Sequence, residues 1–222
     1  MHPSISAFPS AHFYGGRLRD AAAVCSRPAR DFHAHPSGRF GPWVLHQLSG
    51  GTASRGSSLL NPAEAAYALQ LYCALLRAYP AAASLEVGVV TPYAAMRDEL
   101  RRVFAEGLGA AGSRRVAIAT VDAFQGQEKD VVIFCCVRAT PRGGGSRAGV
   151  GFVGDRNRIN VALTRARASL WIVGDFEFLA RSPDWSALWD HARTHNCIYT
   201  PKTPLTPATS KLPVARAVVT LN

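Results

Sequence analysis

The chain has 222 residues, of which 48% are hydrophobic, and it carries 25 basic against 15 acidic side chains. This length and composition are ordinary for one globular domain with a single core, with room for a tail. No apolar run approaches the ~18 to 20 residues that span a bilayer, so we do not expect the chain to be a membrane protein. The run Met1-His2-Pro3-Ser4 lacks the basic and apolar regions that open a secretory signal.

The charge and the cysteines bear on the partner and the compartment. A formal net charge of +10 favours a polyanionic partner, of which nucleic acid is the commonest. Only three of the 25 basic side chains are lysines, so the excess of arginine can equally reflect a GC-rich genome. The five cysteines include no pair spaced like a zinc knuckle, which predicts no metal site and reduced thiols in an intracellular protein. The sequence does not choose between nucleus and cytoplasm.

The first part of the chain contains one well-marked helix. Residues 20–58 are rich in Pro, Gly, Ser and His, which predicts loops around one short strand at 43–48. The run Asn61-Pro62-Ala63-Glu64 then has the parts of a helix start: a capping amide, a proline for the first turn, and a carboxylate that can reach back to the cap's own N–H. The Tyr79-Pro80 pair ends this helix.

From there strands and helices alternate along the chain. Predicted strands lie at 87–91, 116–120, 131–137 and 169–173, and predicted helices at 93–106, 156–167 and 184–194. Nearly continuous apolar strands separated by helices predict an α/β fold, with a mostly parallel sheet and helices on both faces. In such sheets ligands bind beyond the carboxyl ends of the strands. The proline-rich segment from Thr200 onward predicts a disordered tail.

Three polar clusters lie next to the predicted strands. Thr91-Pro92-Tyr93 can bind a phosphate through its hydroxyl and stack its ring on a base, although Thr-Pro is also a common helix opening. Residues 120–130 form a polar loop whose hydrogen-bonding groups must be satisfied internally or by a ligand. Residues 155–167 form the third cluster, and its helix, predicted at 156–167, places Arg158 and Arg165 on one face and Asn160, Thr164 and Arg167 on another. Such arginines suit a phosphoryl group, or they form an ordinary solvated basic face.

Together these clusters resemble the C-terminal motor domain of superfamily 1 helicases, and most closely the branch of the nonsense-mediated-decay helicase and senataxin. The resemblance begins at Met1-His2-Pro3 and Phe13-Tyr14-Gly15-Gly16, includes Thr91-Pro92-Tyr93, and continues through VDAFQGQEKD at 121–130 to NVALTRAR at 160–167. It covers residues 1–198, which leaves 199–222 as the tail. It implies a RecA-like domain of the P-loop-NTPase type, with ATP and Mg²⁺ as cofactors. The implied partners are single-stranded nucleic acid and a first RecA-like domain.

Carried over residue by residue, the resemblance implies individual roles. Arg165 matches the arginine finger that touches the γ-phosphate. Glu128 matches the carboxylate that binds the ribose hydroxyls, and Gly126 lets the backbone approach the nucleotide. Nucleic-acid binding, or its coupling to the nucleotide, is implied for Thr91, Tyr93, Thr120, Asp122 and Gln125. We expect Thr91, Gln125 and Arg165 near the carboxyl edge of the sheet.

The chain departs from the family pattern in several places. Met96 stands where family members usually carry Gln, and residues 139–150 make a longer glycine-rich loop than usual. The chain begins at the Met of a motif that reads Gln-Tyr-Arg-Met-His-Pro in the family. It contains no Gly-x-x-x-x-Gly-Lys-Ser/Thr loop and no strand ending in Asp-Glu that could bind Mg²⁺. We therefore expect an N-terminally truncated domain that does not turn over ATP alone.

Three hypotheses follow from the sequence. The main one is the second motor domain of an ATP-dependent RNA or DNA helicase or translocase, which supplies the finger, the ribose contact and part of the nucleic-acid track. One alternative is a stand-alone nucleic-acid-binding or regulatory module without catalysis, which would have little need for a finger and a ribose carboxylate. The other is an unrelated α/β protein with a basic surface. The sequence distinguishes neither RNA from DNA nor the direction of translocation.

Overall fold

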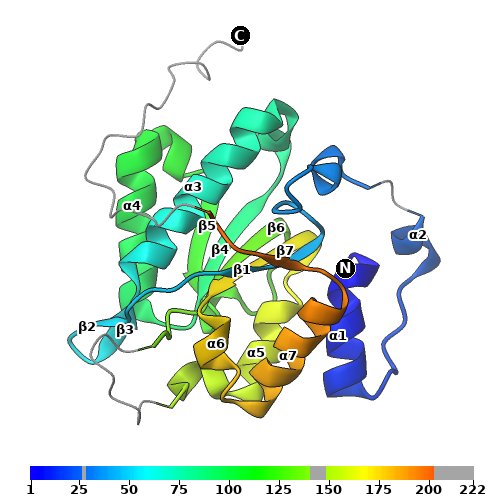
Figure 1. Ribbon diagram of the computed structural model, residues 1–222. Coiled ribbons are helices and arrows are strands. Elements are labelled where there is room, and N and C mark those ends of the chain that lie inside the picture. Colours follow the sequence, from blue (N-terminus) through cyan, green and yellow to red (C-terminus); the bar gives the residue numbers. More distant parts are fainter. Residues whose placement is uncertain (27–28, 141–148, 203–222) are drawn as a thin grey trace.

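A computed structural model describes residues 1–26, 29–140 and 149–202. Its centre is a six-stranded sheet in the order β5-β4-β6-β7-β1-β8, in which every pair of neighbouring strands is parallel (Figure 1). A separate antiparallel hairpin, β2-β3, projects from the molecule. The predicted α/β fold around a parallel sheet is confirmed.

The elements have the following bounds. The strands are β1 (Trp43–Gln47), β2 (Ala53–Arg55), β3 (Ser58–Leu60), β4 (Val87–Thr91), β5 (Val116–Thr120), β6 (Lys129–Cys135), β7 (Ala166–Gly174) and β8 (Ile198–Tyr199). The α-helices are α1 (Pro3–Tyr14), α2 (Ala22–Cys25), α3 (Pro62–Ala78), α4 (Ala94–Ser113), α5 (Arg156–Leu163), α6 (Phe176–Leu179) and α7 (Pro183–Thr194). Short 3₁₀ turns lie at Asp31–Ala34, Pro80–Ser84, Asp122–Phe124 and Gly151–Gly154.

Apolar side chains that alternate along the strands build one core on each face of the sheet. In β6, Val131 and Ile133 pack in the core that α3 and α4 cover. Val132 and Phe134 pack in the opposite core, which α1, α5, α6 and α7 cover. Figure 1 shows these two groups of helices on opposite sides of the strands. Because both faces are buried, the strands appear in the sequence as continuous apolar runs.

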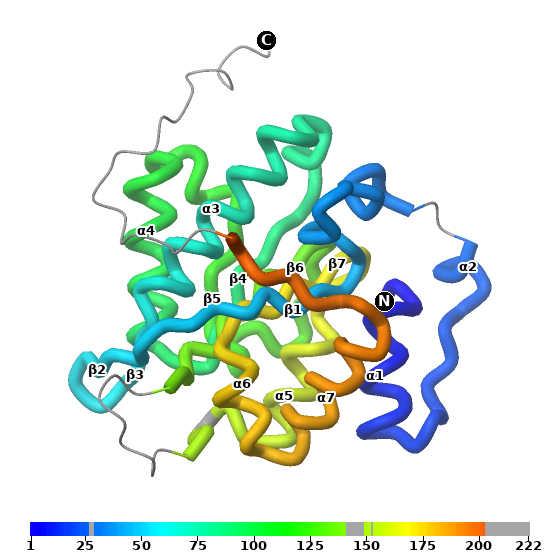
Figure 2. The backbone as a smooth tube through the Cα atoms, viewed as in Figure 1, coloured from blue at the N-terminus to red at the C-terminus, as the bar shows by residue number. Residues whose placement is uncertain are grey.

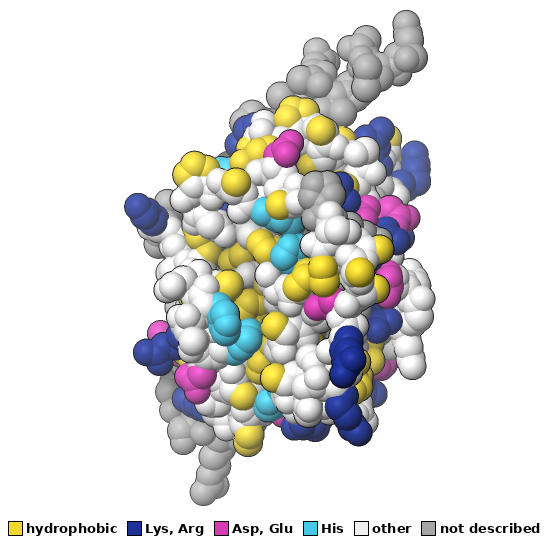
Figure 3. All heavy atoms as spheres, turned by 90° about the vertical axis from the view of Figure 1, so that its right-hand side faces the viewer, with side chains coloured by type: hydrophobic (Ala, Val, Ile, Leu, Met, Phe, Trp, Pro, Cys, Tyr) yellow, Lys and Arg dark blue, Asp and Glu magenta, His cyan; other side chains and the backbone are white. Residues whose placement is uncertain are grey.

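The last described strand, β8, lies against β1, which comes early in the chain. In β8, Ile198 pairs with Leu45 and Tyr199 pairs with His46, and Figure 2 shows this segment running along β1. The strand extends one residue into the predicted tail, of which residues 203–222 lie outside the described part. No helix in the described part is long and apolar enough to cross a membrane. On the face next to α1 and α2, basic side chains lie apart from one another rather than in one tract (Figure 3).

The helix α3 begins as predicted, with one difference. The Asn61 side-chain oxygen accepts hydrogen bonds from the N–H groups of Ala63 at 3.2 Å and Glu64 at 3.3 Å. The predicted return of the Glu64 carboxylate to the Asn61 N–H is wrong. That N–H donates to the Met96 sulfur at 3.4 Å, and Glu64 accepts from the N–H of Val137 instead. Met96 is fully buried, so the position that departs from the family pattern contributes to the core.

Two other segments differ from the sequence-based expectation. The segment 20–58, predicted as loops around one strand, also contains α2, the turn Asp31–Ala34 and the first strand of the hairpin. The helix predicted at 156–167 ends at Leu163 instead, because Ala166 already pairs with Lys129 in β6. This correction moves Arg165 from a helix into a connection and places Arg167 in a strand.

Candidate nucleotide and nucleic-acid site

Thr91 and Thr120 end the neighbouring strands β4 and β5, and they lie side by side at the carboxyl edge of the sheet. The Val121 N–H donates to the Thr91 carbonyl at 2.9 Å directly after β5. The Thr91 side chain is 0% exposed, and its hydroxyl has no hydrogen-bond partner among the described residues. The hydroxyl of the half-buried Thr120 accepts from the Ala123 N–H at 3.4 Å. Both threonines therefore lie at the predicted edge, but Thr91 lies beneath its surface.

Tyr93 stands at the start of α4, two residues beyond Thr91. It is half-buried and packs against the cores on both faces of the sheet. A Cβ placed on Gly151 would lie 3.6 Å from the Tyr93 hydroxyl oxygen. The turn that precedes α5 therefore passes close to the Tyr93 ring. This proximity brings the start of α5 near the start of α4.

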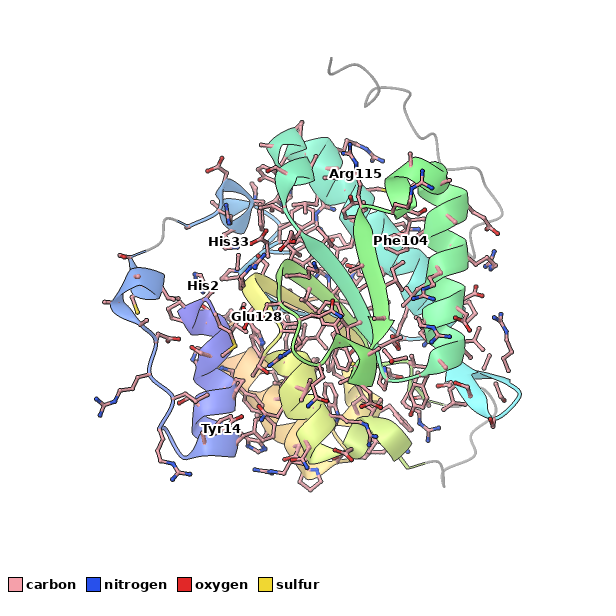
Figure 4. The ribbon with its side chains drawn as sticks, turned by 180° about the vertical axis from the view of Figure 1, so that it is seen from behind. His2, Tyr14, His33, Phe104, Arg115 and Glu128 are labelled. Carbon is pink, nitrogen blue, oxygen red and sulfur yellow. The ribbon has the colours of Figure 1, made fainter. Side chains whose placement is uncertain are left out.

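The connection from β5 to β6 crosses β4 without a long helix. Phe124 is 0% exposed and packs on β4 where Gly88 leaves room, since a Cβ on Gly88 would lie 2.8 Å from the Phe124 ring. Gly126, at φ +79°, takes a conformation that residues with side chains rarely adopt. The chain then enters β6 directly after Glu128 (Figure 4). As a result Gln125, Gly126 and Glu128 are exposed.

Asp122 faces the first turn of α5. Its carboxylate accepts from Arg158 Nε at 3.0 Å, and Arg158 Nη1 also donates to Asp155 at 2.9 Å. The Asp122 hydrogen bond raises the pKa of Arg158, and the Arg158 N–H holds the pKa of the Asp155 carboxyl below its ordinary value. The loop that contains Asp122 and the first turns of α5 border an open pocket of about 310 Å³. The pocket is lined by Val121, Asp122, Gln125, Asp155, Asn157, Arg158 and Val161.

Glu128 and Arg165 lie at the amino edge of the sheet, where β6 and β7 begin. The Lys129 N–H donates to the Arg165 carbonyl at 3.1 Å, and Lys129 pairs with Ala166. The exposed Glu128 makes no hydrogen bond or ion pair with any described residue. The prediction that Arg165 lies near the carboxyl edge is wrong, because a residue that immediately precedes a parallel strand lies at that strand's amino end.

The Arg165 guanidinium is folded back on the end of α5. Its Nε donates to the Val161 carbonyl at 3.1 Å, and its Nη2 donates to the Thr164 hydroxyl at 3.0 Å. No described carboxylate lies within 4.0 Å of this group. Its charge is therefore balanced within the described chain by the partial negative charge at a helix C-terminus. An external anion can bind it without breaking an ion pair.

Arg167, two residues further on, is an ordinary part of the sheet. Its guanidinium donates to Asp130 at 3.2 Å and to Glu86, and Glu86 also accepts from Lys129 at 3.5 Å. The hydrogen bond from Arg167 lowers the pKa of the Glu86 carboxyl. The predicted placement of Arg167 on one helix face with Asn160 is thus wrong, because Arg167 links β7 to β6 and to the start of β4.

A buried polar cluster bonds to Val137, where the chain leaves β6. The sequence analysis did not assign this cluster to the site. Glu64 accepts from the Val137 N–H with both oxygens, at 2.8 and 3.0 Å, and from the Asn61 side-chain amide at 3.2 Å. Burial raises the pKa of Glu64 to about 8, although the Val137 N–H opposes that shift. The Thr52 hydroxyl donates to the Val137 carbonyl at 3.0 Å. The sequence feature that could have indicated this cluster is Glu64 itself, an acid in the otherwise mostly apolar helix α3.

The sequence-predicted site residues therefore fall into two groups. Thr91, Tyr93, Thr120 and Asp122 follow strands at the carboxyl edge, whereas Glu128 and Arg165 precede strands at the amino edge. Gln125 and Gly126 lie on the connection between the two edges. Within residues 1–26, 29–140 and 149–202, no group of three or more His, Cys, Asp or Glu side chains could hold a metal ion.

The sequence matches the AAA domain family over residues 1–177. The chain belongs to this family. It is 37% identical over 203 residues to the helicase sen1 of Schizosaccharomyces pombe, a match that covers 90% of this chain and 12% of that protein. It is 34% identical over 210 residues to the probable helicase MAGATAMA 3 of Arabidopsis thaliana, covering 92% and 25%. It is 38% identical over 192 residues to the putative regulator of nonsense transcripts 1 of Takifugu rubripes, covering 85% and 17%.

These relatives confirm the resemblance to superfamily 1 helicases that the motifs indicate, so this AAA domain is a helicase-family domain. The chain spans between 12% and 25% of the length of the three relatives. The family match covers the whole run from α1 through β7, including both edges of the sheet at which the candidate residues lie.

Proposed function

We propose that this AAA domain, over residues 1–198, is the second motor domain of an ATP-dependent RNA or DNA helicase or translocase. In this proposal Arg165 is the arginine finger for the γ-phosphate, and Glu128 binds the ribose hydroxyls. Thr91, Tyr93, Thr120, Asp122 and Gln125 bind nucleic acid or couple it to the nucleotide. The partners are single-stranded nucleic acid and a first RecA-like domain, inside the cell in nucleus or cytoplasm.

One observation carries the proposal: Glu128 and Arg165 precede neighbouring strands at one edge, and neither has a partner of opposite charge among the described residues. A carboxylate can accept hydrogen bonds from ribose hydroxyls, and a guanidinium can donate to phosphate oxygens. Glu128 and Arg165 therefore suit the ribose and the phosphate end of a nucleoside triphosphate. Gly126, without a side chain and at positive φ, leaves room for a ligand to approach the main chain before Glu128.

In this proposal the metal ion is bound by the first motor domain and not by this chain. The described residues contain no cluster of metal-binding side chains, so the Mg²⁺ that accompanies ATP would be held by the first motor domain. The phosphate-binding loop would come from that domain too. By this argument the chain alone gives no ATP hydrolysis above background.

Coupling between nucleic acid and nucleotide would pass through Asp122. This residue belongs to the carboxyl-edge group, and it holds Arg158 in the same helix that ends beside Arg165. Tyr93 and Gln125 are accessible to a nucleic acid, whereas the buried Thr91 hydroxyl would act by supporting the turn at Val121. A ring at a helix start can stack on a base and tolerate any sequence.

The test is a two-domain protein that joins this chain to the first motor domain of a related helicase. We expect it to hydrolyse ATP with strong stimulation by nucleic acid. Arg165→Ala should lower turnover by about 10³-fold or more, the scale of a lost finger, and leave single-strand binding unchanged. Arg193→Ala, at an exposed arginine of α7, is the matched control. Near-normal turnover with lost nucleic-acid affinity in Arg165→Ala would overturn the assignment and favour a stand-alone binding module.

A further inference from the structure

A chain of hydrogen bonds begins at Tyr14, the last residue of α1. Figure 4 shows Tyr14 at the end of α1 opposite to His2. The Asn160 side-chain amide, in the middle of α5, donates to the Tyr14 hydroxyl at 2.7 Å. The other atom of this amide, Asn160 Oδ1, is buried without a hydrogen-bond partner among the described residues. Tyr14 is therefore the only described group that forms a hydrogen bond with the Asn160 side chain.

The hydrogen bonds continue from Asn160 to Arg165. The Thr164 hydroxyl donates to the Asn160 carbonyl at 2.8 Å and accepts from Arg165 Nη2 at 3.0 Å. Arg165 Nε donates to the Val161 carbonyl at 3.1 Å. The partners of the guanidinium thus lie on the last turn of α5 and at its C-cap, and its direction depends on where this helix end is held.

The helix α1 also holds the start of α5. Arg156 donates to the His12 carbonyl at 2.9 Å and pairs with Asp184 at 2.6 Å, and His12 bonds to the same carboxylate at 2.6 Å. The Arg156 guanidinium lies 5.0 Å from the centre of the Phe13 ring. An eight-residue helix is marginal by itself, so α5 is held by its buried Ile159 and Leu163 and, at its start and middle, by contacts to α1.

We propose that Tyr14 is a positioning residue for Arg165, acting through Asn160 and the last turn of α5. The proposal rests on the proposed function of Arg165 as the arginine finger. Removing the Tyr14 hydroxyl leaves the Asn160 amide without its partner and frees the helix end to shift. Tyr14 does not touch the nucleotide in this arrangement, so its loss lowers the fraction of correctly directed guanidinium without weakening ATP binding.

The first arm of the test uses the full 222-residue chain labelled with ¹⁵N. In Tyr14→Phe, the Nε–H of Arg165 should exchange with solvent about fivefold faster or more, as expected when one neutral hydrogen bond is lost. Asn160→Ala should give the same increase, and the double variant should add nothing further. Tyr79→Phe, at a tyrosine on the opposite face of the sheet, is the control and should leave the exchange unchanged. Unchanged exchange in both Tyr14→Phe and Asn160→Ala would overturn the proposal, whatever Arg165 does in catalysis.

The second arm measures ATP turnover in the two-domain protein. Tyr14→Phe should lower kcat by about five- to tenfold with an unchanged KM for ATP and an unchanged Kd for single strands. A merely structural loss would lower the amount of folded protein instead, which thermal unfolding of the same samples measures. If Arg165→Ala abolishes turnover while folded Tyr14→Phe keeps full kcat, the positioning role is wrong and the finger assignment stands. If Arg165→Ala itself leaves turnover intact, the proposed function fails first.

Discussion

Glu64 turns both oxygens of its carboxyl group to the main-chain N–H of Val137, at 2.8 and 3.0 Å. The contact joins the first turn of α3 to the residue where the chain leaves β6. Val137 has a φ of +74°, which is costly for a β-branched residue, and a buried hydrogen-bonded anchor offsets that cost. Burial raises the pKa of Glu64 to about 8, so the folded protein favours the protonated acid.

The stability of the protein should therefore depend on pH through Glu64. The group has an ordinary pKa of 4.5 in the unfolded chain and about 8 in the folded protein, so the folded state binds more protons between these values. The stabilisation is complete below pH 4.5 and is lost as the pH rises to about 8. Glu64→Gln keeps one accepting oxygen for the Val137 N–H but does not titrate, so it should remove this loss.

Urea unfolding of both proteins at pH 5 and pH 8.5 measures this effect. We expect similar free energies of unfolding at pH 5. At pH 8.5 the variant should be the more stable by on the order of 1 kcal/mol or more. A wild-type protein that gains stability over Glu64→Gln as the pH rises would mean that the pKa of Glu64 is lowered on folding.

Glu99 is a buried acid with the opposite shift. Hydrogen bonds, above all from Arg102 at 2.6 Å and then from Arg55 at 3.0 Å, hold the pKa of the Glu99 carboxyl below its ordinary value. Its stabilisation is present above the ordinary pKa and disappears as the pH falls through the lowered one. Because both guanidinium side chains are more than half exposed, at 52% and 56%, Glu99→Gln should cost only roughly 1 kcal/mol at pH 7. A loss of the same size at pH 3 in urea unfolding would contradict this account.

Gly88 should be essential for the path of the β5–β6 connection. A Cβ there would lie 2.8 Å from the Phe124 ring and 3.1 Å from Lys129 Cγ, so Gly88→Ala should destabilise the protein by about 1 to 3 kcal/mol. Phe124→Leu shortens the opposing side chain, and the double variant should recover part of the loss. Denaturant unfolding of the four proteins tests this coupling. Strictly additive losses would mean that the two side chains do not compete for the same space.

Single-strand binding should depend on the Tyr93 ring and on salt. The chain alone should bind a labelled oligonucleotide weakly, with affinity that falls steeply as salt rises, because contacts to phosphate release counterions. Tyr93→Phe keeps a stacking ring, whereas Tyr93→Leu fills the same half-buried position without one. We expect Phe to preserve the affinity and Leu to lower it about tenfold. Equal affinities for the two variants, or binding that ignores salt, would remove Tyr93 from the nucleic-acid track.

Much of this architecture could be predicted from local sequence. Continuous apolar runs such as 131–137 indicate strands buried on both faces, and Asn61 marks the start of α3 by its capping chemistry. The motifs around Gln125 and Arg165 indicate the helicase family before any fold is known. These features depend on residues that lie close together in the chain, so one sequence is enough to find them.

Long-range contacts account for what the sequence did not predict. Arg165 was expected in a helix, but pairing of Ala166 with Lys129 in β6 ends that helix early. A parallel sheet requires the 121–128 connection to return to the amino edge before β6, but no local pattern predicts that it does so without a long helix, which depends on Phe124 fitting over Gly88. The Glu64–Val137 contact joins residues 73 positions apart, and no local pattern contains it.

Arg165 and Arg167, two residues apart in one motif, should differ in what they do for stability. Arg167 bonds to Asp130 and Glu86 and so links three strand ends, and Arg167→Ala should lower the free energy of unfolding by roughly 1 kcal/mol, with less effect at high salt. Arg165 has no described carboxylate partner and bonds only to the end of α5, so Arg165→Ala should cost about 0.5 kcal/mol or less. Denaturant unfolding of the 222-residue chain at low and high salt separates the two. The reverse order would mean that Arg165 is a structural residue of α5, and the case for an arginine held ready for an external phosphate would lose its physical basis.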